Sequence, residues 1–116
     1  MARQLWLLRH AEAEPHGTRA DSERRLTARG EAQARAAGLA LARLDVSFEA
    51  VLFSPKVRAR QTAELAAEAW EASQRGRLAE YGPLAGDFKA AQVHDALHAI
   101  PADALTSRRA AWRRCA

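Results

Sequence analysis

The stretch that decides the fold is Leu5-Trp6-Leu7-Leu8-Arg9-His10, in which four apolar residues are followed by a guanidinium and an imidazole. A short apolar run of this kind is typical of a strand buried in a parallel sheet. An imidazole can accept a phosphoryl group covalently, and a guanidinium presents a planar fork of donors to phosphate oxygens. The stretch therefore predicts a buried strand with phosphate chemistry at its carboxyl end.

The residues that follow predict a loop, a helix and a second strand. Residues 11–26 are polar and lack periodicity, whereas Thr27 has the position of a helix N-cap. A helix is predicted from residue 28 to about residue 44, with a stripe at helical spacing formed by Ala28, Ala32, Ala36 and Leu39. A second strand is predicted at residues 50–53, because Ser54-Pro55 ends a ladder and suits the start of a helix.

Two further helices are predicted beyond the second strand. The first is expected to bury Ala59, Ala63, Ala66 and Trp70. After an irregular segment at residues 81–87, the last helix is expected to bury Val93, Leu97 and Ile100. Strands that alternate with helices are typical of an α/β protein with a parallel sheet. Such sheets bind ligands beyond the carboxyl ends of their strands, which is where Arg9-His10 and Ser54-Pro55 fall.

Composition indicates one domain that needs no disulfide, because the 116 residues contain one cysteine. No apolar run is long enough for a signal peptide or a membrane span, so a soluble cytoplasmic protein without a membrane partner is expected. Residues 1–107 hold equal numbers of acidic and basic side chains, and the formal charge of +4 falls on Arg108, Arg109, Arg113 and Arg114. A short terminal patch does not make a nucleic-acid surface, and none is expected.

Three motifs together resemble the histidine phosphatase superfamily. They are Leu7-Leu8-Arg9-His10-Ala11-Glu12, Arg25-Leu26-Thr27-Ala28-Arg29-Gly30, and Phe53-Ser54-Pro55-Lys56-Val57-Arg58-Ala59-Arg60-Gln61-Thr62. Their order and spacing are similar to those of the small SixA-type phosphohistidine phosphatases. The resemblance covers about residues 3–105. It implies a three-layer α/β/α fold with a mostly parallel central sheet, as in the phosphoglycerate mutase-like proteins.

The resemblance also implies roles for individual residues. His10 would be the nucleophile that becomes phosphohistidine, and Arg9 and Arg58 would clamp the phosphate. No metal or cofactor is implied. Glu80 is a candidate proton donor, with a surface carboxylate as the alternative, and Ser54 is a candidate phosphate hydrogen-bond donor. Gly30 is expected to serve backbone packing.

The C-terminal segment departs from this pattern. Family members carry a second histidine behind a further apolar strand, whereas residues 106–116 contain no Val, Ile, Leu or His. We therefore expect an incomplete domain at residues 1–105, with its last strands missing, and a basic tail at residues 106–116. Out-of-frame translation or truncation is favoured over an evolved short form.

Two classes of function follow. The first is a metal-independent phosphatase acting on a phosphohistidine protein, or alternatively on a small phosphomonoester, with activity impaired by the missing histidine. The second is a non-catalytic, phosphate-binding fragment. Exposed strand edges would favour self-association in either case.

Overall fold

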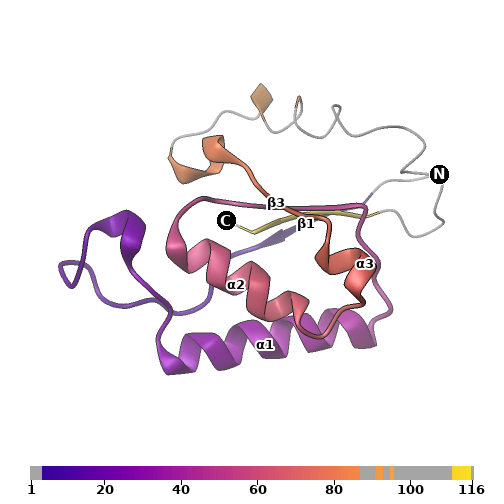
Figure 1. Ribbon diagram of the computed structural model, residues 1–116, viewed down its shortest axis with the longest axis horizontal. Coiled ribbons are helices and arrows are strands. Elements are labelled where there is room, and N and C mark those ends of the chain that lie inside the picture. Colours follow the sequence, from indigo (N-terminus) through magenta and orange to yellow (C-terminus); the bar gives the residue numbers. More distant parts are fainter. Residues whose placement is uncertain (1–3, 87–90, 93–94, 96–110, 116) are drawn as a thin grey trace.

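Strand β1 (Gln4–Leu8) forms where the apolar run predicts it. The computed structural model describes residues 4–86, 91–92, 95 and 111–115, in which β1 is joined by β2 (Ala50–Phe53), β3 (Leu78–Glu80) and β4 (Ala111–Cys115). The strand order is β1-β4-β2-β3, and each neighbouring pair is parallel (Figure 1). The predicted α/β class with a parallel sheet is confirmed.

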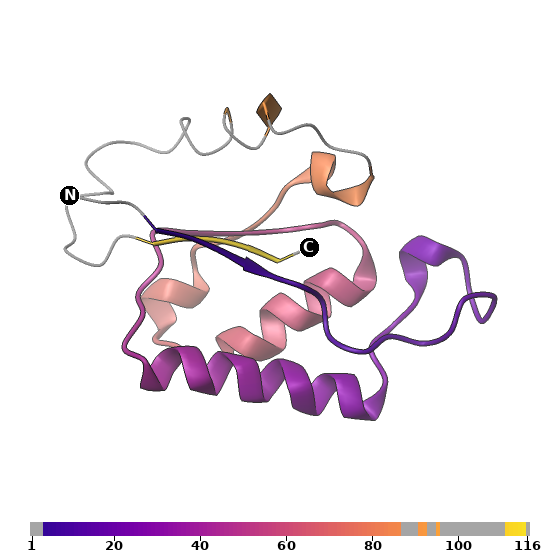
Figure 2. The same ribbon diagram turned by 180° about the vertical axis from the view of Figure 1, so that it is seen from behind.

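Strand β4 corrects the expectation that no strand follows residue 105. Residues Ala111–Cys115 lie between β1 and β2, with Cys115 in register with both Leu8 and Phe53 (Figure 2). Parallel pairing uses backbone N–H and C=O groups, which residues of any polarity supply, so the absence of an apolar pattern does not exclude a strand. The two predicted strands are therefore parallel members of one sheet that are separated by β4. The out-of-frame origin of the segment stays a prediction.

Helix α1 (Ala28–Arg43) begins as predicted but buries a different face. The Thr27 side chain accepts a hydrogen bond from the Gly30 N–H at 3.0 Å, which confirms the N-cap. The predicted stripe is wrong, since Leu39 is 44% exposed and the buried residues are Gly30, Ala34, Gly38 and Leu41. Alanine occurs on every side of this helix, so the sequence shows no contrast between an apolar face and a polar face. Its orientation is decided by contact with a neighbouring helix, at Gly38, where an added Cβ would lie 1.9 Å from the Ala66 carbonyl oxygen.

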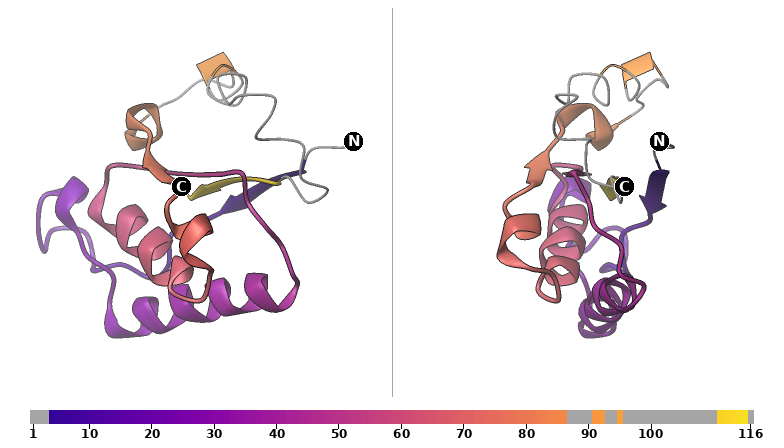
Figure 3. Two further views of the ribbon diagram at one scale, coloured as in Figure 1. Left: turned by 45° about the vertical axis from the view of Figure 1, so that its right-hand side comes forward. Right: turned by 90° about the vertical axis from the view of Figure 1, so that its right-hand side faces the viewer.

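Helix α2 (Val57–Ala67) follows the strand end marked by Ser54-Pro55, and its predicted buried face is confirmed. Trp70 lies just beyond the helix, with its ring centroid 4.9 Å from that of Phe48. Its indole N–H donates to the Gly38 carbonyl at 3.1 Å. This contact joins the end of α2 to the middle of α1, and both helices lie on the same side of the sheet (Figure 3).

The remaining described elements are short. Helix α3 (Ala72–Arg75) precedes β3, a strand of three residues that is too brief to show a sequence period. Two 3-10 turns, η1 (Asp21–Glu23) and η2 (Gly82–Ala85), lie in the connections. Val93, Leu97 and Ile100, which were expected to line a third helix, lie outside the described residues. Within the described ranges, the helices are too short or too polar to cross a bilayer.

Candidate active site

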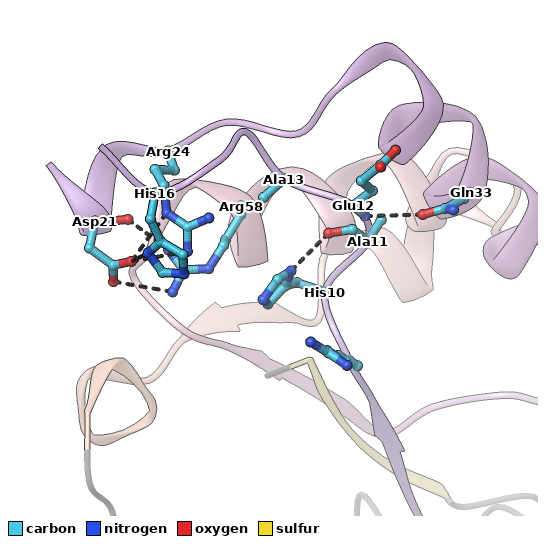
Figure 4. Close-up of a pocket in the computed structure, with 10 residues that line it drawn as sticks. His10, Ala11, Glu12, Ala13, His16, Asp21, Arg24, Gln33 and Arg58 are labelled. Carbon is cyan, nitrogen blue, oxygen red and sulfur yellow. Dashed lines mark hydrogen bonds and ion pairs between the residues drawn. The ribbon is translucent and has the colours of Figure 1, made fainter. Parts of the chain in front are cut away.

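A cavity of about 700 Å³ lies beyond the carboxyl end of β1 (Figure 4). Most of its wall comes from the loop between β1 and α1, with one residue each from α1 and α2. The lining residues are Arg9, His10, Ala11, Glu12, Ala13, His16, Asp21, Arg24, Gln33 and Arg58. The fold thus brings together three of the residues that the sequence singles out, Arg9, His10 and Arg58, from positions about fifty residues apart in the chain.

The orientation of His10 follows from one hydrogen bond. Its Nδ1 atom lies 2.8 Å from the Ala11 carbonyl oxygen, which can only accept, so Nδ1 carries the proton of the neutral ring. Burial lowers the pKa of His10 below its ordinary value of 6.5; the hydrogen bond to Ala11 opposes this effect, and the positive charge of Arg58 adds to it. The ring is therefore neutral at pH 7, and Nε2 keeps its lone pair.

Thr62 connects the backbone beside His10 to helix α2. The Ala11 N–H donates to Thr62 Oγ1 at 3.1 Å, and the Thr62 hydroxyl donates to the Arg58 carbonyl at 2.7 Å. This side chain is almost fully buried. Sequence reasoning missed its role, although a hydroxyl on a face otherwise made of alanines is a signal that could have found it. Thr62 thereby fixes the position of the Ala11 backbone relative to the Arg58 backbone.

The N-terminus of α1 holds the same loop from the other side. The Glu12 N–H donates to Gln33 Oε1 at 3.0 Å, and the Thr27 N–H donates to the Glu12 carbonyl at 3.0 Å. An added Cβ on Gly30 would lie 2.0 Å from the Glu12 carbonyl oxygen. The expected packing role of Gly30 is confirmed, because only a residue without a side chain permits this approach.

Arg58 and Arg24 both contact Asp21, and each arginine is 7% exposed. The Arg58 NH1 group donates to the Asp21 carbonyl at 2.7 Å, and its NH2 group to Asp21 Oδ2 at 3.3 Å. Arg24 donates to Asp21 Oδ1 through Nε at 3.1 Å and NH2 at 3.0 Å. Hydrogen bonds from Arg24 and Lys56, together with the charge of Arg58, hold the pKa of Asp21 well below its usual range.

Neither Asp21 nor Arg24 is among the site residues predicted from the sequence. Both stand in a polar loop without periodicity, so pattern alone does not separate them from its other charged residues. Their spacing of three residues, with opposite charges, is the signal that could have drawn attention to them.

Ser54 and Glu80 lie elsewhere. Ser54 is buried, and its Oγ accepts from the Lys56 N–H at 3.2 Å, so it supports the turn into α2. Glu80 ends β3, where its Oε1 accepts from Arg60 at 2.7 Å. Neither residue lines the cavity. In the described part of the chain, no three His, Cys, Asp or Glu side chains gather in a way that could hold a metal ion.

The motifs and geometry agree with a match to a known family. Residues 5–113 match the histidine phosphatase superfamily (branch 1). The chain belongs to this superfamily. One curated relative, an uncharacterized protein of Picosynechococcus sp., is 40% identical over 67 residues, which are 57% of this chain and 41% of that protein. The chain thus matches less than half the length of this curated relative.

Solved structures resemble this histidine phosphatase chain over nearly all its length. The protein histidine phosphatase SixA in complex with tungstate aligns with a TM-score of 0.78 and 25% identity, covering 97% of this chain and 68% of that one. A protein of Nakamurella multipartitia assigned by name to SixA gives 0.72 and 27%, covering 97% and 58%. One from Agrobacterium tumefaciens gives 0.72 at 19% identity, covering 97% and 68%, which supports the shared fold.

Proposed function

We propose that this chain is a phosphatase that transfers the phosphoryl group of its substrate to His10 without a metal ion. The observation that carries the proposal is the state of the His10 ring: it is neutral, its Nδ1 proton is held by the Ala11 carbonyl, and it lies in one cavity with Arg9 and Arg58. A neutral imidazole with one free nitrogen is a nucleophile, and guanidinium groups are suited to phosphate oxygens.

The chemistry takes two steps. His10 Nε2 attacks phosphorus; the new N–P bond forms as the bond to the leaving atom breaks, and the leaving atom keeps the electron pair and takes up a proton from water. A water molecule then attacks the phosphorus, the N–P bond breaks, and inorganic phosphate and a proton are released. Arg9 and Arg58 stabilise the charge on the equatorial oxygens. The buried Nε of Arg58 has no hydrogen-bond partner among the described residues.

The substrate class we propose is phosphohistidine on a protein. Glu80, the candidate proton donor, is paired with Arg60 and does not line the cavity. A leaving imidazole needs less proton assistance than an alkoxide, so this arrangement suits phosphohistidine better than a phosphomonoester. The likeness to SixA, described as a protein histidine phosphatase, supports the same choice.

We expect turnover by these 116 residues alone to be slow. The resemblance implies a second histidine beyond a further strand, and residues 106–116 contain none. Strand β4 pairs with β1, the strand that His10 follows. The residues of β4 are Ala-Trp-Arg-Arg-Cys, none of which is a histidine. A chain that binds phosphate without turnover is the alternative.

The proposal is tested by trapping the intermediate. The purified chain is incubated with phosphoramidate or a phosphohistidine peptide in the presence of EDTA and examined by mass spectrometry. We expect an acid-labile adduct on His10 that is absent from His10→Ala and retained in His16→Ala, a second histidine of the cavity. An adduct on another residue, or none on the wild-type chain, would overturn the proposal. Faster labelling by p-nitrophenyl phosphate than by the phosphohistidine peptide would favour a small phosphomonoester.

A further inference from the structure

One carboxylate contacts two buried guanidinium groups at the wall of the cavity. Asp21 lies in the 3-10 turn η1, with a side chain 48% exposed, and bonds Arg24 through Oδ1 and Arg58 through Oδ2. Arg24 and Arg58 come from different segments, the loop before α1 and the helix α2. Lys56 lies on the same carboxylate, with Nζ 3.3 Å from Oδ2. Asp21 therefore joins the loop that forms most of the cavity wall to helix α2, which contributes Arg58 to it.

The contacts fix the direction of each guanidinium. Arg58 donates from NH1 and NH2, one to the carbonyl and one to the carboxylate of Asp21, and these two bonds define the plane of the group. Its Nε takes no part in them. Arg24 is fixed in the same manner by Nε and NH2 on Asp21 and by NH1 on the Glu14 carbonyl at 2.6 Å. Like charges this close to one cavity repel each other, and the carboxylate between them offsets the repulsion.

We propose that Asp21 is a positioning residue, which holds Arg58 and Arg24 in the orientation that binds the phosphoryl group. The inference rests on the proposed function, since phosphate is the ligand of the cavity. The opposite possibility is that Asp21 is an internal anion that competes with phosphate for Arg58. Positioning is favoured because the shortest contact of Arg58, at 2.7 Å, is to the Asp21 backbone carbonyl, and because Nε remains outside the contact.

The first experiment measures binding of inorganic phosphate and of tungstate by calorimetry to the full chain and to Asp21→Asn. Loss of the charge-assisted bonds should raise both dissociation constants about tenfold or more. Glu23→Gln is the matched control, since it removes the same charge from the same turn; both constants should stay within about twofold of wild type, because exposed charges act weakly at a distance. Tighter or unchanged binding by Asp21→Asn would overturn the proposal. Tighter binding would favour the possibility that Asp21 competes with phosphate for Arg58.

A second measurement separates this inference from the proposed function. The side-chain Nε–H signals of Arg58 and Arg24 are recorded by nitrogen-15 NMR without phosphate. They should be immobile in the wild-type chain and in Glu23→Gln, and mobile in Asp21→Asn; equal mobility in all three would overturn the positioning role. If the wild-type chain binds no phosphate, the proposed function fails and this measurement still decides the inference. If Asp21→Asn does not fold, Asp21→Ser takes its place, since it also removes the carboxylate; affinity and mobility equal to wild type would contradict the proposal.

Discussion

At the scale of single residues, the reactivity of His10 depends on the atom that its ring faces. The Ala11 carbonyl fixes the proton on Nδ1, and burial together with nearby guanidinium groups disfavours a second proton. A histidine at a strand end in contact with water would instead be partly protonated near neutral pH. The same residue type is thus a base on the surface, whereas in this cavity we propose it as a nucleophile.

The pKa of His10 gives the first prediction at this scale. Because the pKa of His10 is lowered from its ordinary value of 6.5, the acid limb of the pH–rate profile should have its midpoint below pH 6.5. In Arg58→Gln the removal of a positive charge should raise the pKa of His10. Both are measured by following the His10 Cε1–H signal through a pH titration.

Arg60→Gln serves as the control for this titration, because Arg60 is an exposed residue of the same helix and is paired with Glu80. It should leave the His10 titration unchanged. A wild-type pKa at or above 6.5, or equal shifts in the two variants, would contradict the electrostatic explanation.

At the scale of elements, the cavity depends on how closely α1 packs on α2. Gly38 and Gly30 each lie where a Cβ would collide with a carbonyl oxygen, of Ala66 and Glu12 respectively. One glycine sets the distance between the helices, and the other sets the distance between α1 and the loop after His10. The helix that supports the loop and the helix that carries Arg58 are thereby held against each other.

Substitution of Gly38 tests this packing. Gly38→Ala should lower the free energy of unfolding by about 1–3 kcal/mol, because the added methyl group must displace helix backbone. Gly76→Ala is the matched control, since its Cβ would lie 3.6 Å from the Ala72 carbonyl oxygen, an ordinary contact. Urea denaturation measures both variants. Equal stability of Gly38→Ala and wild type would show that the two helices can separate without cost.

At the scale of the whole molecule, the sheet is assembled from segments at opposite ends of the chain. Strand β4 pairs with β1 and β2, so the carboxyl end of each strand reaches the edge where the cavity lies. Alternate residues of β1 face opposite sides: Trp6 and Leu8 pack toward the core, whereas Leu7 is 64% exposed. Strand β4 therefore lies beside the strand that leads to His10.

A chimera tests the contribution of the C-terminal segment. Residues 106–116 are replaced by the corresponding segment of a SixA-type relative that carries the second histidine, and hydrolysis of a phosphohistidine peptide is measured with EDTA present. We expect the turnover rate to rise by roughly 10² to 10³, the effect of one preorganised donor in comparable sites. A rate within a few-fold of the present chain would show that the second histidine is not limiting.

The sequence alone determined several local features of the fold. The strand before Arg9-His10, the Thr27 N-cap and the buried alanines of α2 were predicted correctly, because each depends on local preference or on periodicity within one element. The expected burial of that strand is correct for one face only, since Leu5 is 47% and Leu7 64% exposed. The presence of His10 and Arg58 at one cavity was also predicted, since parallel strands place their carboxyl ends at one edge of the sheet.

Only the tertiary structure decided the rest. The buried face of α1, the strand β4, and the roles of Thr62 and Asp21 depend on contacts between segments distant in sequence. In a helix rich in alanine, the sequence does not show which face is buried. Strand pairing uses backbone groups, so it does not require a particular pattern of side-chain polarity. The sequence pattern of a segment indicates which of its residues are buried. Which residues of distant segments form hydrogen bonds depends on the tertiary geometry that brings them together.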